Sequence, residues 1–156
     1  MHNAVMAGFE LGTDGPGSIV VGVDGSATSL RAAAYAAGLA RRQRTKLVVV
    51  YARSAPGGML SLADLSGLAS RAAMESQDQL AAQLEAELQK QARVWGVDAK
   101  LVVRAGEPLS VLSEVAAEVR ADAVIVGSSA SIGHRIAGSL AVRLVRAGLW
   151  PVTVVP

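Results

Sequence analysis

The sequence predicts an α/β fold in which a five-stranded, mostly parallel sheet has helices on both faces. The first observation is that five short apolar runs alternate with segments of helical periodicity along the 156-residue chain. The second is that these runs show no polar alternation, which is typical of strands covered on both faces of a parallel sheet. The predicted strands are residues 18–23, 46–51, 99–104, 123–126 and 152–155.

The first predicted helix begins after Ser26 or Ser29, either of which is a favourable N-cap residue, and reaches about Gln43. Its expected buried stripe is mostly alanine, which predicts close packing against the sheet. The stripe consists of Leu30, Ala33, Ala34, Ala37 and Ala40.

The second predicted helix runs from Leu60 to Trp95, as one long helix or with one break. Three leucines, Leu80, Leu84 and Leu88, recur at four-residue spacing on its apolar face. Gly96 suits the C-terminal cap.

The third helix opens at Gly106-Glu107-Pro108, where proline in the first turn loses no intrahelical hydrogen bond. Its apolar face consists of Val111, Leu112, Val115, Ala116 and Val119. The fourth helix begins behind Gly138-Ser139 and ends at Gly148.

Residues 1–17 show no periodicity and finish in a cluster of glycine, proline and aspartate, so we expect a flexible N-terminal arm. Residues 18–156 then form one domain. With 51% hydrophobic residues, a chain of this length can bury a sizeable core without disulfides or metal.

Composition excludes several functional classes. The chain has no cysteine, which rules out disulfides and thiolate chemistry, and its two histidines are far apart, which argues against a metal site. No apolar run is long enough to span a membrane and no secretory signal is evident, so a cytoplasmic location is expected. A net charge of +2 and a single phenylalanine argue against nucleic-acid binding.

The segment from the fourth strand to the fourth helix predicts an anion site. A buried strand ends at Gly127, ten small, flexible or basic residues follow, and Gly138-Ser139 starts a helix. A helix N-terminus offers free backbone N–H groups and a partial positive charge, so phosphate is the natural ligand. In an open parallel sheet the ligand lies at the carboxyl ends of the strands.

Individual residues near this edge allow two interpretations. Asp24 could hydrogen-bond a ribose hydroxyl or an adenine edge, hold a metal indirectly, or serve only as a turn residue. Gly127 could let a ligand approach the backbone, or simply form a tight strand exit. His134 and Arg135 could meet phosphate charge or be solvated loop cations.

No pattern predicts catalysis, so we expect no catalytic residue. The sequence lacks the nucleophile elbow of serine hydrolases, the lysine-containing phosphate loop of nucleotide triphosphatases and the complete dinucleotide fingerprint. A phosphoacceptor domain would need a late lysine, yet the last lysine is Lys100.

Five motifs together resemble the universal stress protein family over Ser18 to Pro156. They are VVGVDGS, the GEP turn, ADAVIVGS, the Gly-Ser helix start and the closing PVTVVP. The resemblance implies strand order 3-2-1-4-5 and a cytoplasmic protein made during stress or growth arrest. It also implies a homodimer joined through the last strands and, in many members, binding of ATP or a related adenine nucleotide.

The family's nucleotide motif, Gly-x2-Gly-x9-Gly-Ser/Thr, is incomplete here. Ala130 stands where the second glycine belongs, and seven residues rather than nine separate it from Gly138; Gly133 is a displaced substitute. The resemblance implies that Asp24 and Ala52 border adenine and ribose, with Mg accompanying a bound polyphosphate. The residues implied to face the phosphates are Gly127, Ser128, Gly138, Ser139 and Leu140.

Two functions follow from this partial match. The protein is a regulator that binds an adenine nucleotide, or it resembles the universal stress protein A type, which does not bind ATP and would act through contacts with unknown protein partners. Slow ATP hydrolysis is a third, less favoured interpretation, because no base is evident.

The last predicted strand, Val152–Val155, suggests how the protein assembles. In the implied order it lies at the sheet edge, and no charge interrupts PVTVVP. An antiparallel two-fold copy would satisfy its open backbone groups, which predicts a homodimer. The alternative is that the N-terminal arm covers the edge.

Overall fold

The fold was obtained as a computed structural model that describes residues 17–53, 67–128 and 139–156. Strands and helices alternate along these residues, as predicted. In chain order they are β1 (Ser18–Val23), α1 (Ala27–Gln43), β2 (Lys46–Arg53), α3 (Leu68–Trp95), β3 (Ala99–Ala105), α4 (Pro108–Glu118), β4 (Ala121–Gly127), α5 (Leu140–Ala147) and β5 (Val152–Val155).

The five strands form one sheet in the order β3-β2-β1-β4-β5, which confirms the predicted order. Every pair of neighbouring strands is parallel. Val21 in the central strand lies opposite Val49 of β2 and Ile125 of β4. The carboxyl ends of all five strands therefore lie at one edge of the sheet.

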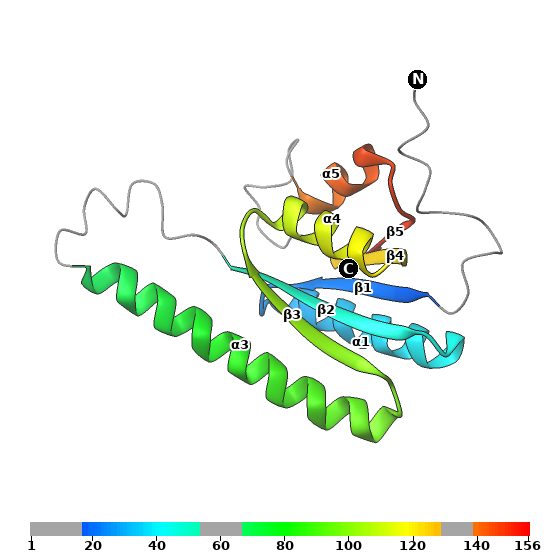
Figure 1. Ribbon diagram of the computed structural model, residues 1–156, viewed down its shortest axis with the longest axis horizontal. Helices are drawn as coiled ribbons and strands as arrows, with labels where there is room; N and C mark the ends of the chain where they lie inside the picture. The colour runs from blue at the N-terminus through cyan, green and yellow to red at the C-terminus, as the bar shows by residue number, and fades with distance from the viewer. Residues whose placement is uncertain (1–16, 54–66, 129–138) are drawn as a thin grey trace.

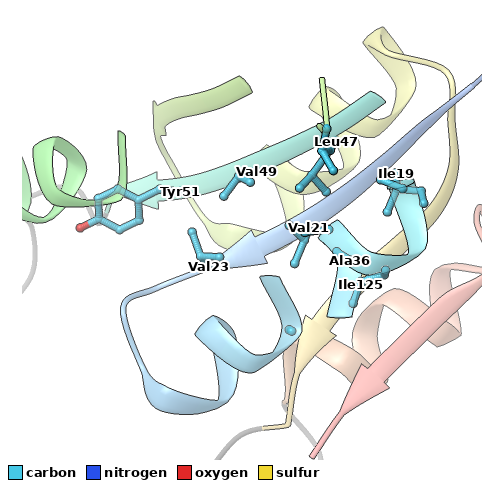
Figure 2. Packing of buried hydrophobic residues seen from close by; sticks show 12 residues of the cluster. Ile19, Val21, Val23, Ala36, Leu47, Val49, Tyr51 and Ile125 are labelled. Atoms are coloured by element: carbon cyan, nitrogen blue, oxygen red, sulfur yellow. The ribbon is translucent and has the colours of Figure 1, made fainter. Parts of the chain in front are cut away.

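Helices cover both faces of the sheet, with α1 and α3 on one and α4 and α5 on the other (Figure 1). Successive side chains of a strand point to opposite faces. Ile19 and Val21 of β1 therefore join the core beneath α1, where Figure 2 shows them with Val49 of β2. Val20 joins the other core, with Val115 of α4 and Leu144 of α5.

The start of α1 explains one wrong prediction. Ser26 caps the helix by accepting a hydrogen bond from the Ser29 N–H at 3.2 Å, and Ser29 Oγ donates to the Ser26 carbonyl at 2.9 Å. These bonds satisfy the hydrogen-bonding groups of Ser29, so Ser29 can be buried and its face of α1 packs toward the sheet. Leu30 is 48% exposed, contrary to the predicted stripe, and Ala34 is also exposed. The buried face is nevertheless mostly alanine: Ala32, Ala36, Ala37 and Ala40.

Most other helix predictions are confirmed. Leu80, Leu84 and Leu88 pack against the core, and Gly96 caps α3 in the left-handed conformation at φ 65°. Pro108 is the first residue of α4, whose predicted apolar face is packed in the core. The predicted stretch 60–66 lies outside the described residues.

Three strands are longer than predicted, because their parallel register continues past the apolar runs. Arg53 of β2 pairs with Ala105 of β3, beyond the predicted ends of both strands. The predicted arm, apart from Gly17, lies outside the described residues, and its separation from the domain stays a prediction. Among the described helices, none combines the length and apolar character that a membrane span requires.

Candidate functional site

A cavity of about 480 Å³ lies at the carboxyl ends of β1, β2 and β4. The cavity lies next to the topological switch point between β1 and β4, where the strand order reverses. Open parallel sheets bind ligands at such points. The lining residues are Gly22, Val23, Asp24, Ser26, Thr28, Ser29, Val50, Ala52, Glu107, Pro108, Leu112, Val126, Gly127, Ser128, Ser139, Leu140, Ala141 and Arg143.

The cavity brings together the site residues predicted from the sequence that the structure describes. These residues are Asp24, Ala52, Gly127, Ser128, Ser139 and Leu140. The remaining one, Gly138, and the loop cations His134 and Arg135 lie outside the described residues. Residues more than 80 positions apart in sequence therefore face one space, as the crossing of parallel strands requires.

Asp24 is held by the turn between β1 and α1. Its Oδ1 accepts a hydrogen bond from the Ser26 N–H at 2.9 Å, and its own N–H donates to Ser29 Oγ at 3.2 Å. Partial burial raises the pKa of Asp24, but hydrogen bonds from Ser26 and Ser29 outweigh it, so the pKa lies below its ordinary value. Asp24 is therefore a fixed carboxylate at neutral pH and an acceptor for hydroxyl or amino groups.

Three helices begin at the cavity, and α5 leaves its N-terminus the most available to an anion. The first turn of α4 is already occupied by the Glu107 side chain, and that of α1 adjoins Asp24. Ser139 caps α5 by accepting a hydrogen bond from the Val142 N–H at 3.3 Å, and no acidic residue lies in the first turn. The partial positive charge of this helix end is thus not neutralised by its own sequence.

Glu107 and Arg143 were missed by the sequence analysis. Glu107 caps α4 through Oε2, which accepts the Ser110 N–H at 3.1 Å, while Oε1 accepts a hydrogen bond from Arg143 Nη1 at 2.6 Å. Desolvation raises the pKa of Glu107, but the Arg143 and Ser110 bonds prevail and hold it below its ordinary value. The GEP turn indicates that Glu107 lies at a helix start. No local pattern predicts its ion pair with Arg143, which is 36 positions away in the sequence.

Gly127 has a packing role that neither sequence interpretation included. A methyl group at this position would lie 2.6 Å from the carbonyl carbon of Thr28, within the first turn of α1. Glycine therefore lets the end of β4 approach the helix backbone closely. That contact fixes the distance between two walls of the cavity.

The remaining walls are apolar. Val50 comes from β2 and Val126 from β4, on either side of β1. Leu112 and Leu140 come from α4 and α5. Such walls suit a flat ring, while the charged and hydroxyl groups lie at the helix starts. Among the described residues, no three potential metal-binding side chains cluster together.

Comparison with protein-family models gives a match to the Universal stress protein family over residues 17–156. Comparison with curated proteins gives no match.

Solved structures support this assignment. A universal stress protein in complex with cAMP is 27% identical, with a TM-score of 0.65, covering 90% of this chain and 97% of that one. A family member from Burkholderia pseudomallei is 25% identical, with a TM-score of 0.64 and coverage of 90% and 96%. One from Archaeoglobus fulgidus in complex with dAMP, at 24% identity, TM-score 0.61 and coverage of 90% and 98%, shows the shared fold. Since the family model spans nearly the whole chain, the chain belongs to the universal stress protein family.

Proposed function

We propose that this protein is a cytoplasmic stress-response regulator that binds an adenine nucleotide, such as ATP, in the cavity beside β1 and β4. The observation that carries the proposal is the pairing of apolar walls with an unneutralised helix N-terminus in one space. The cAMP complex of the 27% identical family member supports an adenine nucleotide as the ligand.

The charges suggest how the nucleotide is oriented. The ionised Asp24 repels phosphate and accepts hydrogen bonds, so the ribose or adenine lies beside it, near Ala52. The phosphates lie beside Ser128 and Ser139, where the N–H groups and dipole of α5 favour negative charge. Mg²⁺ would then be held mainly by phosphate oxygens, as is usual for this ion.

Arg143 supplies a cation for the same phosphates. It lines the cavity and is held by Glu107 at 2.6 Å in the structure. A bound phosphate would compete with Glu107 for the guanidinium group, because Glu107 holds Arg143 through one hydrogen bond and a phosphate can accept two. Nucleotide affinity thus depends on the difference between these two interactions.

The site favours binding over catalysis. The hydroxyls of Ser26, Ser29 and Ser139 already serve the helix starts. The lowered pKa values of Asp24 and Glu107 make both carboxylates weak general bases at neutral pH. No other described side chain lining the cavity could activate a water molecule.

The proposed assembly is a homodimer formed through β5. Among the described residues, this strand pairs only with β4, and it contains no charged residue. The opposite edge strand, β3, contains Lys100 and Arg104. Val154 is 43% exposed, and Val145 and Leu149 near α5 are 59% and 46% exposed. A second copy would pair with the open edge and cover these side chains.

A second candidate function, action through protein contacts without a nucleotide, is favoured by one observation. Glu107 already neutralises Arg143, so the cation does not need a ligand.

Calorimetric titration with Mg-ATP, AMP and cyclic AMP separates the two functions, together with mass spectrometry of nucleotide that copurifies with the protein. We expect saturable binding of at least one nucleotide. Absence of both binding and copurifying nucleotide would favour the second function.

A further inference from the structure

An apolar groove, distinct from the proposed nucleotide cavity, lies between α1 and α3. This apolar groove has a volume of about 430 Å³ and its floor is formed by the sheet. Leu30 of α1 and Trp95 of α3 line it and are 48% and 38% exposed, so both helices present apolar side chains to solvent along the groove. The floor consists of Val23, Leu47, Val49 and Ala99.

The groove continues into a smaller hollow of about 340 Å³ at the amino ends of the strands. Val97 lines both spaces. On α1, Ala37 lines the groove and Ala40, one turn further on, lines the hollow. Gly17, the first described residue, also lines the hollow, so the chain that precedes it emerges there.

The hollow has a basic rim. Three basic residues, Arg41, Arg44 and Lys46, line the hollow. Of the described residues that line it, only Asp98 is acidic. Within the described chain none of the three cations forms an ion pair. A segment that binds here would therefore need acidic residues for the basic hollow and, next to them, apolar residues for the groove.

We propose that the N-terminal arm, residues 1–16, is that segment and that its apolar part docks in the groove between α1 and α3. Val5, Met6, Phe9 and Leu11 supply the apolar side chains, and Glu10 and Asp14 supply the acidic ones. Asp14 lies three residues before Gly17 in the sequence, so the basic rim is within its reach. Opposite charges at this distance attract, although the rim's solvent exposure limits the energy.

The arm is long enough for this path. Leu11 precedes Gly17 by six positions, and a chain segment of that length can span up to about 20 Å when extended. Along α1, the ten-position step from Leu30 to Ala40 rises only about 15 Å. Leu11 can thus enter the groove, and Phe9 and Met6 can lie further along it.

The segment between β2 and α3, residues 54–66, is the competing occupant. It contains apolar residues, including Leu62, but a single acid, Asp64. It also leaves the sheet at Arg53, at the carboxyl ends of the strands, away from the basic hollow. Charge and point of departure both favour the arm.

The absence of native cysteine allows a direct test in the full-length chain. Phe9→Cys is combined with Ala34→Cys, which lies exposed in the groove, and the protein is oxidised under mild conditions. The matched control combines Phe9→Cys with Ala82→Cys, an exposed α3 position outside the groove lining. We expect an intramolecular disulfide several-fold more abundant with Ala34→Cys.

Other outcomes would overturn the proposal. A yield equal to the control, or a disulfide that forms only between chains, would exclude docking of the arm in its own groove. Preferential coupling of Leu62→Cys to Ala34→Cys would assign the groove to residues 54–66 instead. If Lys46→Glu leaves the Phe9–Ala34 yield unchanged, the basic rim has no part in docking and the charge argument fails.

A second measurement does not depend on cysteine. Binding of the fluorescent dye 1-anilinonaphthalene-8-sulfonate is compared for the parent, Phe9→Asp and the control Asn3→Asp, which adds the same charge outside the apolar part of the arm. We expect several-fold more dye binding for Phe9→Asp alone, because the groove is uncovered. Equal dye binding by the three proteins would contradict docking.

Discussion

Arg143 Nη1 lies 2.6 Å from Glu107 Oε1, and this ion pair joins α5 to the N-cap of α4 at the cavity beside β1 and β4. Both side chains are partly exposed. An ion pair this exposed is weak enough for a phosphate group to displace, so Glu107 would compete with the proposed nucleotide for Arg143.

The first prediction is that Glu107→Gln tightens nucleotide binding. Glutamine keeps an acceptor for the Ser110 N–H but releases Arg143, so affinity for AMP should rise by up to about five-fold, the equivalent of an exposed ion pair. Calorimetric titration measures the change, with adenosine as a ligand that lacks phosphate. Glu118→Gln, which alters an acid paired with Arg104 away from the cavity, serves as control. Weaker AMP binding by Glu107→Gln would contradict competition.

The second prediction concerns the start of α5. Aspartate and asparagine both cap helices as well as serine does, so Ser139→Asp and Ser139→Asn should unfold at similar temperatures. Only Ser139→Asp adds a negative charge where phosphate is proposed to bind, and it should lose about ten-fold or more in ATP affinity. If both variants bind ATP equally, the phosphates do not lie at this helix end.

The third prediction concerns Gly127. Gly127→Ala forces a methyl group against the Thr28 backbone and should lower the free energy of unfolding by about 1–3 kcal/mol. Gly38→Ala is the matched control, because its methyl would meet only the flexible end of Arg42 within α1. This control should stabilise the protein by about 0.5–1 kcal/mol. Urea unfolding measures both, and equal signs would refute the packing role.

Much of the fold was predictable, because the signals that define it are local. Unbroken apolar runs such as Val48–Val50 indicate strands buried on both faces, and Gly96 and Pro108 mark helix boundaries within a few residues. The phase of α1 was not predictable from hydrophobicity, since it depends on hydrogen bonds that allow Ser29 to be buried and Leu30 to be exposed.

The candidate site was predictable only in part, for a related reason. Residues at the ends of strands, such as Asp24 and Ser128, meet wherever parallel strands meet, so topology alone brings them together. The partnership of Glu107 with Arg143 depends on how α4 lies against α5, which no local pattern encodes. The close contact of Gly127 with Thr28 likewise depends on packing between separate elements.

The fourth prediction concerns acid. The folded state lowers the pKa of Asp24, so the stabilisation is fully present above the ordinary pKa of the carboxyl group and is lost as pH falls through the lower pKa of the folded state. Asp24→Asn should therefore lower the free energy of unfolding by less than about 1 kcal/mol near pH 7, because the carboxyl group is exposed. The decrease should be smaller still near pH 3. Urea unfolding at both pH values measures the difference. A cost that grows toward low pH would contradict the lowered pKa.

The last prediction tests the proposed dimer. Val154 lies on the edge strand β5, whose outer side pairs with no strand among the described residues. In the proposed dimer, a charged side chain at this position would be buried between two copies. Val154→Lys should convert the dimer to a monomer at micromolar concentration, as measured by light scattering or sedimentation. Ala105→Lys places the same charge on the exposed end of β3, the opposite edge, and should leave the dimer intact. Because β3 already contains Lys100 and Arg104, an added lysine there changes little, whereas β5 has no charge to oppose pairing. A monomeric parent protein, or a dimer that persists in Val154→Lys, would place the interface elsewhere.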